Sequence, residues 1–237
     1  MGAVSAVARE ALDAAAAREW LRGFAAAVAE RSGELTDLDR PVGDSDHGVN
    51  LRRGTEAVLA ALDADGAGGA GGADGTPGQV LGAAGRTLVS TVGGASGPLF
   101  GTALRRAGKA LGEVPAADAA QVAAALRAAL EGVVRLGEAR VGDATMVDAL
   151  DPAVAAFERA AQEGAPLPRA ARAAAGAAAE GAASTVPLVA RKGRASYLGP
   201  RSRGHLDPGA RSVELLLTAL ADALGADALD ARAGEGA

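Results

Sequence analysis

The sequence contains no cysteine, only 2% aromatic residues and no long uninterrupted apolar run. Without cysteine there can be no disulfide bonds and no thiolate metal ligands, so any metal ion must be bound by oxygen or imidazole. Charged residues between Arg9 and Glu19 interrupt the N-terminal region, and no segment reaches the ~18 consecutive apolar residues of a membrane-spanning helix. We therefore expect a cytoplasmic protein with neither a signal peptide nor a membrane span.

Basic residues are also in the minority, with 24 Lys and Arg against 29 Asp and Glu and a net charge of −5. A chain with this balance is not expected to bind nucleic acid in general. One segment, 191–203, is locally basic and would suit a small anion such as a phosphate group.

What the chain does contain is alanine, which makes up about a quarter of its 237 residues, within an apolar fraction of 49%. Alanine has the highest helix propensity, and β-branched residues are sparse, so the composition favours helices over strands. The length and apolar content suffice for a substantial core. We expect an all-α fold in a single domain, residues 1–237.

Apolar residues recur at helical spacing in eight segments, which predicts eight helices. The approximate ranges are 11–31, 51–62, 79–92, 98–111, 115–138, 146–157, 168–185 and 210–224. Residues 63–78 are nearly all Gly, Ala and Asp, and we expect a flexible insertion there. Residues 187–209 show no helical period, and residues 225–237 are expected to form a frayed tail.

The densest polar cluster lies between the first two predicted helices, within residues 38–50, and contains Asp39, Asp44 and Asp46. Carboxylates held close together repel one another, and a cation would keep them ionised. An EF-hand is excluded, because Val49 and Thr55 stand where that loop requires glycine and glutamate. Few carboxylates without a closed cage fit Mg²⁺ that shares its coordination with phosphate oxygens. The alternative is that these aspartates only cap the following helix.

Two helix starts offer backbone N–H groups to an anion. The first contains His47, Gly48 and Asn50, and the second follows the glycine-rich segment 93–98. His47 could be a ligand, a donor to phosphate or an ordinary loop histidine. The segment 93–98 could equally be a common glycine turn. The basic segments 191–199 and 204–210 could be a solvated loop or a lid over a polyphosphate. The two helix starts and these basic segments together are consistent with a bound nucleotide.

The sequence resembles the L subunits of dihydroxyacetone kinases, which correspond to the nucleotide-binding domain of the single-chain enzymes. The resemblance rests on four motifs that occur in order, and it extends from the first predicted helix to Ser212. These are residues 38–50 (Leu-Asp, then Gly-Asp-Ser-Asp-His-Gly-Val-Asn), 93–101, 142–150 (Gly-Asp-Ala-Thr-Met-Val-Asp-Ala-Leu) and 193–210. One departure is Ala144, where the family commonly has lysine, and the insertion 63–78 is another.

This resemblance implies an eight-helix antiparallel barrel with ADP or ATP bound in the loops at one end. It implies that Asp39, Asp44 and Asp46 are the catalytic residues and bind two Mg²⁺ ions. The nucleotide-contacting positions that it implies are His47, Gly48, Val49, Asn50, Ala95, Ser96, Gly137, Met146, Arg194, Asp207, Pro208 and Gly209.

The implied activity is phosphoryl transfer to dihydroxyacetone held on a separate K subunit. Bound ADP would be recharged by an M subunit of the phosphotransferase system, or ATP would exchange directly, and we prefer the first. A homodimer is possible. The alternatives are an ATP-dependent subunit for another short ketose such as a tetrulose, and a regulator whose nucleotide state a transcription factor senses.

Overall fold

The computed structural model describes residues 8–65 and 75–225, and these residues are almost entirely helical. The helices are α1 (Ala14–Glu30), α2 (Ser32–Asp39), α3 (His47–Asp65), α4 (Pro77–Thr91), α5 (Ser96–Leu111), α6 (Ala119–Gly137), α7 (Met146–Gln162), α8 (Leu167–Ser184) and α9 (Pro208–Ala223), with one 3₁₀ segment, η1 (Arg194–Ser202). Two short strands, β1 (Leu12–Asp13) and β2 (Ala116–Ala117), pair antiparallel with Leu12 opposite Ala117. The expected all-α helical bundle is confirmed.

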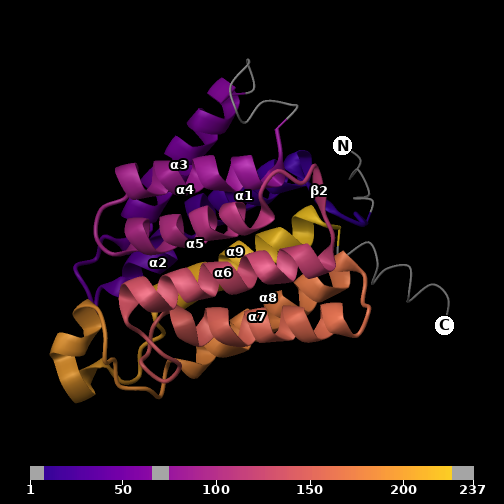
Figure 1. The fold of residues 1–237 in the computed structure, drawn as a ribbon. Helices are drawn as coiled ribbons and strands as arrows, with labels where there is room; N and C mark the ends of the chain where they lie inside the picture. The colour runs from indigo at the N-terminus through magenta and orange to yellow at the C-terminus, as the bar shows by residue number, and fades with distance from the viewer. Residues whose placement is uncertain (1–7, 66–74, 226–237) are drawn as a thin grey trace, which may run out of the picture.

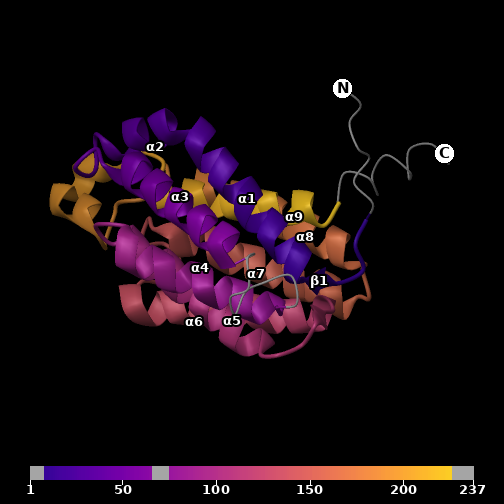
Figure 2. The ribbon, with the colours of Figure 1, turned by 90° about the horizontal axis from the view of Figure 1, so that it is seen from above.

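The eight long helices form a closed ring. Starting at α1, contacts run through α3, α4, α5, α6, α7 and α8 to α9, and α9 packs back against α1. Figures 1 and 2 show these helices lying side by side with their axes roughly aligned. Alanine, leucine and valine make up most of the interior, in which Phe24 and Phe100 lie with ring centroids 6.1 Å apart. The Trp20 indole N–H donates to the Leu216 carbonyl at 2.8 Å and ties α1 to α9.

Small residues allow neighbouring helices to approach closely. A Cβ at Gly85 would lie 2.6 Å from the Gly101 carbonyl oxygen, so α4 and α5 meet backbone to backbone. In the alanine-rich helix α8, buried alanines face the interior, and a Cβ at Gly181 would lie 2.4 Å from the Asp148 carbonyl oxygen. Interiors packed at this density have no room for an added methyl group. The alanine-rich helix α8 therefore packs closely against α7.

Since successive helices alternate in direction, four connections meet at one end of the ring. They comprise residues 40–46, 92–95, 138–145 and 185–207. All lie at the left of Figure 1, opposite the end where β1 and β2 pair. This arrangement brings together the four sequence motifs, although they span most of the chain.

The structure differs from the sequence-based expectation in three places. Residues 32–39 form α2, whose 8 residues are too short to give a clear period. The segment 187–209, in which no helical period was visible, contains η1, a 3₁₀ segment kinked at Gly199 (φ 56°). Within the expected insertion 63–78, residues 63–65 belong to α3 and residues 77–78 begin α4, where Thr76 and Gln79 form a capping box. The rest of that insertion, residues 66–74, and residues 226–237 of the expected tail lie outside the described residues.

None of the helices within 8–65 and 75–225 combines the length and the apolarity that crossing a membrane would require.

Candidate functional site

The three aspartates of the first motif converge at the open end of the ring. Asp39 is the last residue of α2, Asp44 and Asp46 lie in the loop, and one carboxylate oxygen from each lies within 4.8 Å of the others. Asp39 is buried, and its Oδ2 accepts the backbone N–H groups of Asp46 at 3.0 Å and His47 at 3.3 Å. The loop is thus folded around one carboxylate at the start of α3, where N–H groups and the helix dipole stabilise negative charge.

The tightness of this turn depends on Gly43. Its N–H donates to the Asp39 carbonyl at 2.6 Å, and a Cβ at this position would lie 1.9 Å from Asp39 Oδ1. Ser45 follows with φ 63°, a conformation that non-glycine residues seldom adopt. The turn therefore needs glycine at 43 for space and accepts strain at 45.

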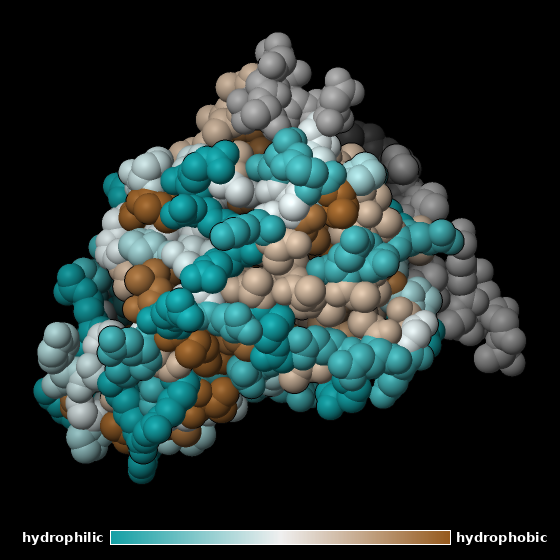
Figure 3. Space-filling view, in the orientation of Figure 1, coloured by the Kyte–Doolittle hydropathy of each residue, from teal (hydrophilic) through white to brown (hydrophobic). Residues whose placement is uncertain are grey.

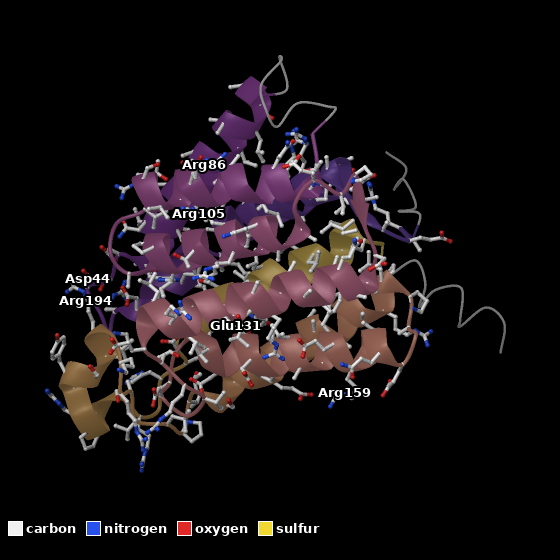
Figure 4. The ribbon with its side chains drawn as sticks, viewed as in Figure 1. Asp44, Arg86, Arg105, Glu131, Arg159 and Arg194 are labelled. Atoms are coloured by element: carbon white, nitrogen blue, oxygen red, sulfur yellow. The ribbon has the colours of Figure 1, made fainter. Side chains whose placement is uncertain are left out.

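The carboxylates influence one another. Burial raises the pKa of Asp46, and a hydrogen bond from Asn50 lowers it, while the neighbouring Asp44 raises it further. Asp44 is exposed and forms an ion pair with Arg194 Nη2 at 2.8 Å. Figure 4 shows both residues at the end of the bundle where η1 begins. The basic segment thus reaches the acidic loop, although about 150 residues separate them in sequence.

His47 is buried and connects three helices. Its Nε2 lies 2.8 Å from Ser212 Oγ in α9, and its Nδ1 lies 3.0 Å from Ser96 Oγ at the start of α5. Burial lowers the pKa of His47, against an opposing effect of the Asp39 charge. The imidazole is therefore neutral at physiological pH, and its two hydrogen bonds link the start of α3 to α5 and α9.

Two further loops complete the end of the ring. Thr145 caps α7 by accepting the Val147 N–H at 3.2 Å, and the buried Asp148 accepts the N–H groups of Gly142 at 2.6 Å and Thr145 at 2.8 Å. Asp207 caps α9, accepting the Ala210 N–H at 2.7 Å. Burial raises the pKa of Asp207 to about 7, and the charge of Asp148 contributes to this rise.

Between these loops lies a cavity of about 320 Å³. The three aspartates line it from α2 and the loop before α3, and the apolar residues Leu99, Phe100, Val133 and Met146 line it from α5, α6 and α7. Aspartates can bind a cation, and the helix starts beside them can bind phosphate groups. The apolar side chains suit a base, so the cavity matches a nucleotide together with its metal ion.

Comparisons with known proteins agree with this geometry. Residues 41–222 match the DAK2 domain family. The chain belongs to the DAK2 domain family. The ADP-binding subunit DhaL of the PEP-dependent dihydroxyacetone kinase of Escherichia coli K12 is 41% identical over 85% of this chain and 93% of that protein. The corresponding subunit of the PTS-dependent kinase of Lactococcus lactis is 34% identical, over 85% and 93% of the two chains. The resemblance to dihydroxyacetone kinase L subunits is thereby confirmed.

Longer DAK2 proteins are also similar. The D-erythrulose kinase of Mycolicibacterium smegmatis is 38% identical over 88% of this chain, which spans 36% of that protein. Among solved structures, the dihydroxyacetone kinase of C. freundii in complex with AMP-PNP and Mg²⁺ superposes with a TM-score of 0.65 at 25% identity. That match covers 94% of this chain and 36% of the other.

Most residues expected to form the site of this DAK2 domain line the cavity. They are Asp39, Asp44, Asp46, His47, Asn50, Ala95, Ser96, Gly137, Met146, Arg194, Asp207, Pro208 and Gly209. Two expected residues lie apart from it. Gly48 packs against α2, where a Cβ would lie 2.1 Å from the Ser32 carbonyl oxygen, and Val49 points outward with 57% exposure.

Sequence reasoning did not assign several cavity residues of the DAK2 domain to the site. These are Val42, Gly93, Gly94, Leu99, Phe100, Val133, Ala139, Ala144, Thr145, Val147, Lys192, Gly193 and Ala195. Phe100 and Val133 lie in the segments 98–111 and 115–138, which were predicted as helices from their apolar spacing, and an apolar residue near a helix end can contact both the core and a ligand. For Val42 and Ala139, the sequence carries no signal.

The donor set fits a hard divalent cation. Three carboxylate oxygens within mutual reach, one of them on a carboxyl group whose pKa is raised, are the arrangement that such a cation stabilises. Cys and thiolate ligands are absent from the chain, which agrees with oxygen coordination.

Proposed function

We propose that this chain is the ADP- or ATP-binding subunit of a dihydroxyacetone kinase, which transfers a phosphoryl group to dihydroxyacetone carried by a separate K subunit. The observation that carries the proposal is the convergence of three aspartates on a cavity that is also lined by apolar side chains of α5, α6 and α7. The similarity to stand-alone ADP-binding subunits over 93% of their length supports it.

Asp39, Asp44 and Asp46 would hold the metal, for which we propose two Mg²⁺ ions. When bound, Mg²⁺ supplies neutralisation of charge on the transferring phosphoryl group. The chain itself contributes N–H donors at the start of α5, after Gly94, which has φ 67° and around whose Cβ position there is open space. The apolar side formed by Leu99, Phe100 and Met146 excludes water from the base.

Arg194 has a positioning role at the mouth of the cavity. Its pair with Asp44 joins two exposed side chains, so it contributes less than about 1 kcal/mol and exchanges readily. The Arg194 guanidinium can exchange the Asp44 carboxylate for a phosphate group of the nucleotide. That exchange would draw η1 towards the bound nucleotide.

The rim of the cavity suits a protein partner. Val49, Leu136, Val141 and Tyr197 are 57%, 50%, 58% and 89% exposed, and each lies within three residues of a residue that lines the cavity. Figure 3 shows exposed hydrophobic residues at the left end of the molecule, where the four connections meet. Exposed apolar side chains beside a reactive centre are typical of a protein interface. We assign this rim to the K subunit. The M subunit of the phosphotransferase system, which would recharge bound ADP, needs access to the same opening.

Calorimetric titration with ADP in the presence of Mg²⁺ tests the binding function. The Asp44→Ala and Asp46→Ala variants should lose Mg-dependent binding and keep their helical circular dichroism. Asp37→Ala is the matched control, because Asp37 is an exposed aspartate of α2 that pairs with the surface residue Arg40. Unfolding of both loop variants would favour a capping role instead, and failure of the unmodified chain to bind ADP or ATP would refute the proposal.

Reconstitution with a K subunit tests the reaction. We expect phosphorylation of dihydroxyacetone, with erythrulose assayed in parallel because erythrulose kinases are similar. Two results together would support recharging of bound ADP. ADP should remain bound through purification, and activity should require an M subunit and phosphoenolpyruvate-derived phosphate. Full activity with ATP alone would contradict it.

Val49→Ser should lower the rate of this reconstituted reaction and leave ADP affinity unchanged. Val89→Ser is the control, since Val89 is a comparably exposed valine (41%) of α4 that lies outside the rim, more than three residues from any residue that lines the cavity. Equal rates for the two variants would remove Val49 from the proposed interface.

A further inference from the structure

The hydrogen bonds around His47 form a chain that ends on a backbone carbonyl. Ser96 Oγ lies 3.0 Å from His47 Nδ1, and His47 Nε2 lies 2.8 Å from Ser212 Oγ. Ser212 Oγ in turn lies 2.9 Å from the carbonyl oxygen of Pro208, in the first turn of α9. Ser212 has no exposed surface and does not line the cavity, so no ligand can touch it.

The carbonyl end fixes the direction of every proton in this chain. A carbonyl oxygen only accepts, so in the bond to Pro208 the Ser212 hydroxyl is the donor and directs its single proton at that oxygen. The Ser212 oxygen is then an acceptor towards His47, and Nε2 must carry the ring proton. In a neutral imidazole the other nitrogen is an acceptor, so Nδ1 receives the hydroxyl proton of Ser96.

This direction determines what Ser96 offers to the cavity. Because its proton points at Nδ1, Ser96 can present only oxygen lone pairs to a ligand. The hydroxyl therefore accepts from a donor, such as a ligand hydroxyl or a metal-bound water, and does not donate to a phosphate oxygen. At the same helix start, the backbone N–H groups of α5 remain the donors.

We propose that Ser212 is a positioning residue that holds His47 in the Nε2–H tautomer and thereby makes Ser96 a hydrogen-bond acceptor in the nucleotide cavity. The part that concerns the nucleotide rests on the function proposed above. The tautomer itself does not, so the two can be tested separately.

Nitrogen-15 NMR of the imidazole rings in the full chain reads the tautomer directly, since a protonated and an unprotonated ring nitrogen resonate far apart. The chain has only 2 histidines, so in a His205→Gln variant every remaining imidazole signal belongs to His47. At pH 8, above the ordinary histidine pKa of ~6.5, we expect a protonated Nε2 and an unprotonated Nδ1. In Ser212→Ala, where Nε2–H would face a methyl group, the ring should shift towards Nδ1–H and donate to Ser96.

Two further variants make the test independent of any folding defect. Ser212→Thr keeps a hydroxyl that can bond the carbonyl four residues earlier, and should restore the Nε2–H tautomer. Ser96→Ala should leave Nε2 protonated, because its acceptor Ser212 is intact. A wild-type Nδ1–H tautomer, or an unchanged tautomer in a folded Ser212→Ala chain, would overturn the proposal.

The positioning role is tested by calorimetry with Mg-ADP. Ser212→Ala should bind about tenfold more weakly, as expected when one acceptor in a cavity becomes a donor, and Ser212→Thr should recover affinity. Ser184→Ala is the matched control, since Ser184 also donates to a carbonyl of its own helix but contacts no histidine. A tautomer shift with unchanged affinity would refute the effect of Ser212 on the cavity. Absence of nucleotide binding in the wild type would refute the proposed function and leave the tautomer result standing.

Discussion

Replacing Gly43 with alanine should abolish the geometry of the aspartate loop while leaving the helical ring intact. The new Cβ would lie 1.9 Å from Asp39 Oδ1, whereas such contacts are essentially never shorter than 3.0 Å, so the carboxylate must move away. That movement breaks the bonds that its other oxygen accepts from the N–H groups of Asp46 and His47. A hydrogen bond to a charged group contributes about 1.5–3 kcal/mol, which corresponds to a loss of about 10- to 100-fold in Mg-ADP affinity.

The assay combines calorimetric titration with Mg-ADP and thermal unfolding of the ligand-free chain. Gly33→Ala is the control, because Gly33 lies in the adjacent α2 and a Cβ there meets nothing within 4 Å. Because Gly33 is the second residue of α2, that substitution should leave the chain as stable as the wild type or slightly more stable. Wild-type affinity in Gly43→Ala would show that the position of the Asp39 carboxylate does not determine metal and nucleotide binding.

Three further predictions follow from buried or paired groups. Burial raises the pKa of Asp207 from 3.8 to about 7, so its folded form holds a proton that the unfolded chain releases, and the free energy of unfolding should fall as pH rises through this range. Asp207→Asn retains a capping side chain and should flatten this dependence in urea titrations at several pH values; an unchanged slope would exclude Asp207 as its source. Gly181→Ala should lower the free energy of unfolding by about 1–3 kcal/mol, measured by thermal unfolding, because the Cβ meets a backbone oxygen of α7. Gly176→Ala in the same helix meets nothing within 4 Å and should stabilise the chain. Equal effects of the two substitutions would contradict the close packing of α8 against α7. Arg194→Ala should change stability by less than about 1 kcal/mol, since its partner Asp44 is exposed, yet weaken Mg-ADP binding; a large stability loss would assign Arg194 to the fold.

Much of the site could be located from local sequence patterns. The acidic cluster, the glycine at 43 and the glycine-rich start of α5 are contiguous in sequence, and their chemistry follows from the residues themselves. Helical periodicity likewise gave the eight long helices, because each buries one face along its whole length. Periodicity failed for α2 and η1, which are too short or too tightly wound to show a 3.6-residue repeat.

What the sequence alone determined, then, is the set of helices and the presence of a cluster that requires a cation. Only the tertiary structure decided which distant residues complete the site. His47 meets Ser212 across 165 positions, Arg194 reaches Asp44, and the apolar side of the cavity is drawn from α5, α6 and α7. These contacts depend on closure of the helical ring, which brings four separate connections to one end, and no local pattern encodes where a ring closes. The burial that raises the pKa of Asp207 and the proton direction imposed through Ser212 follow from the same closure.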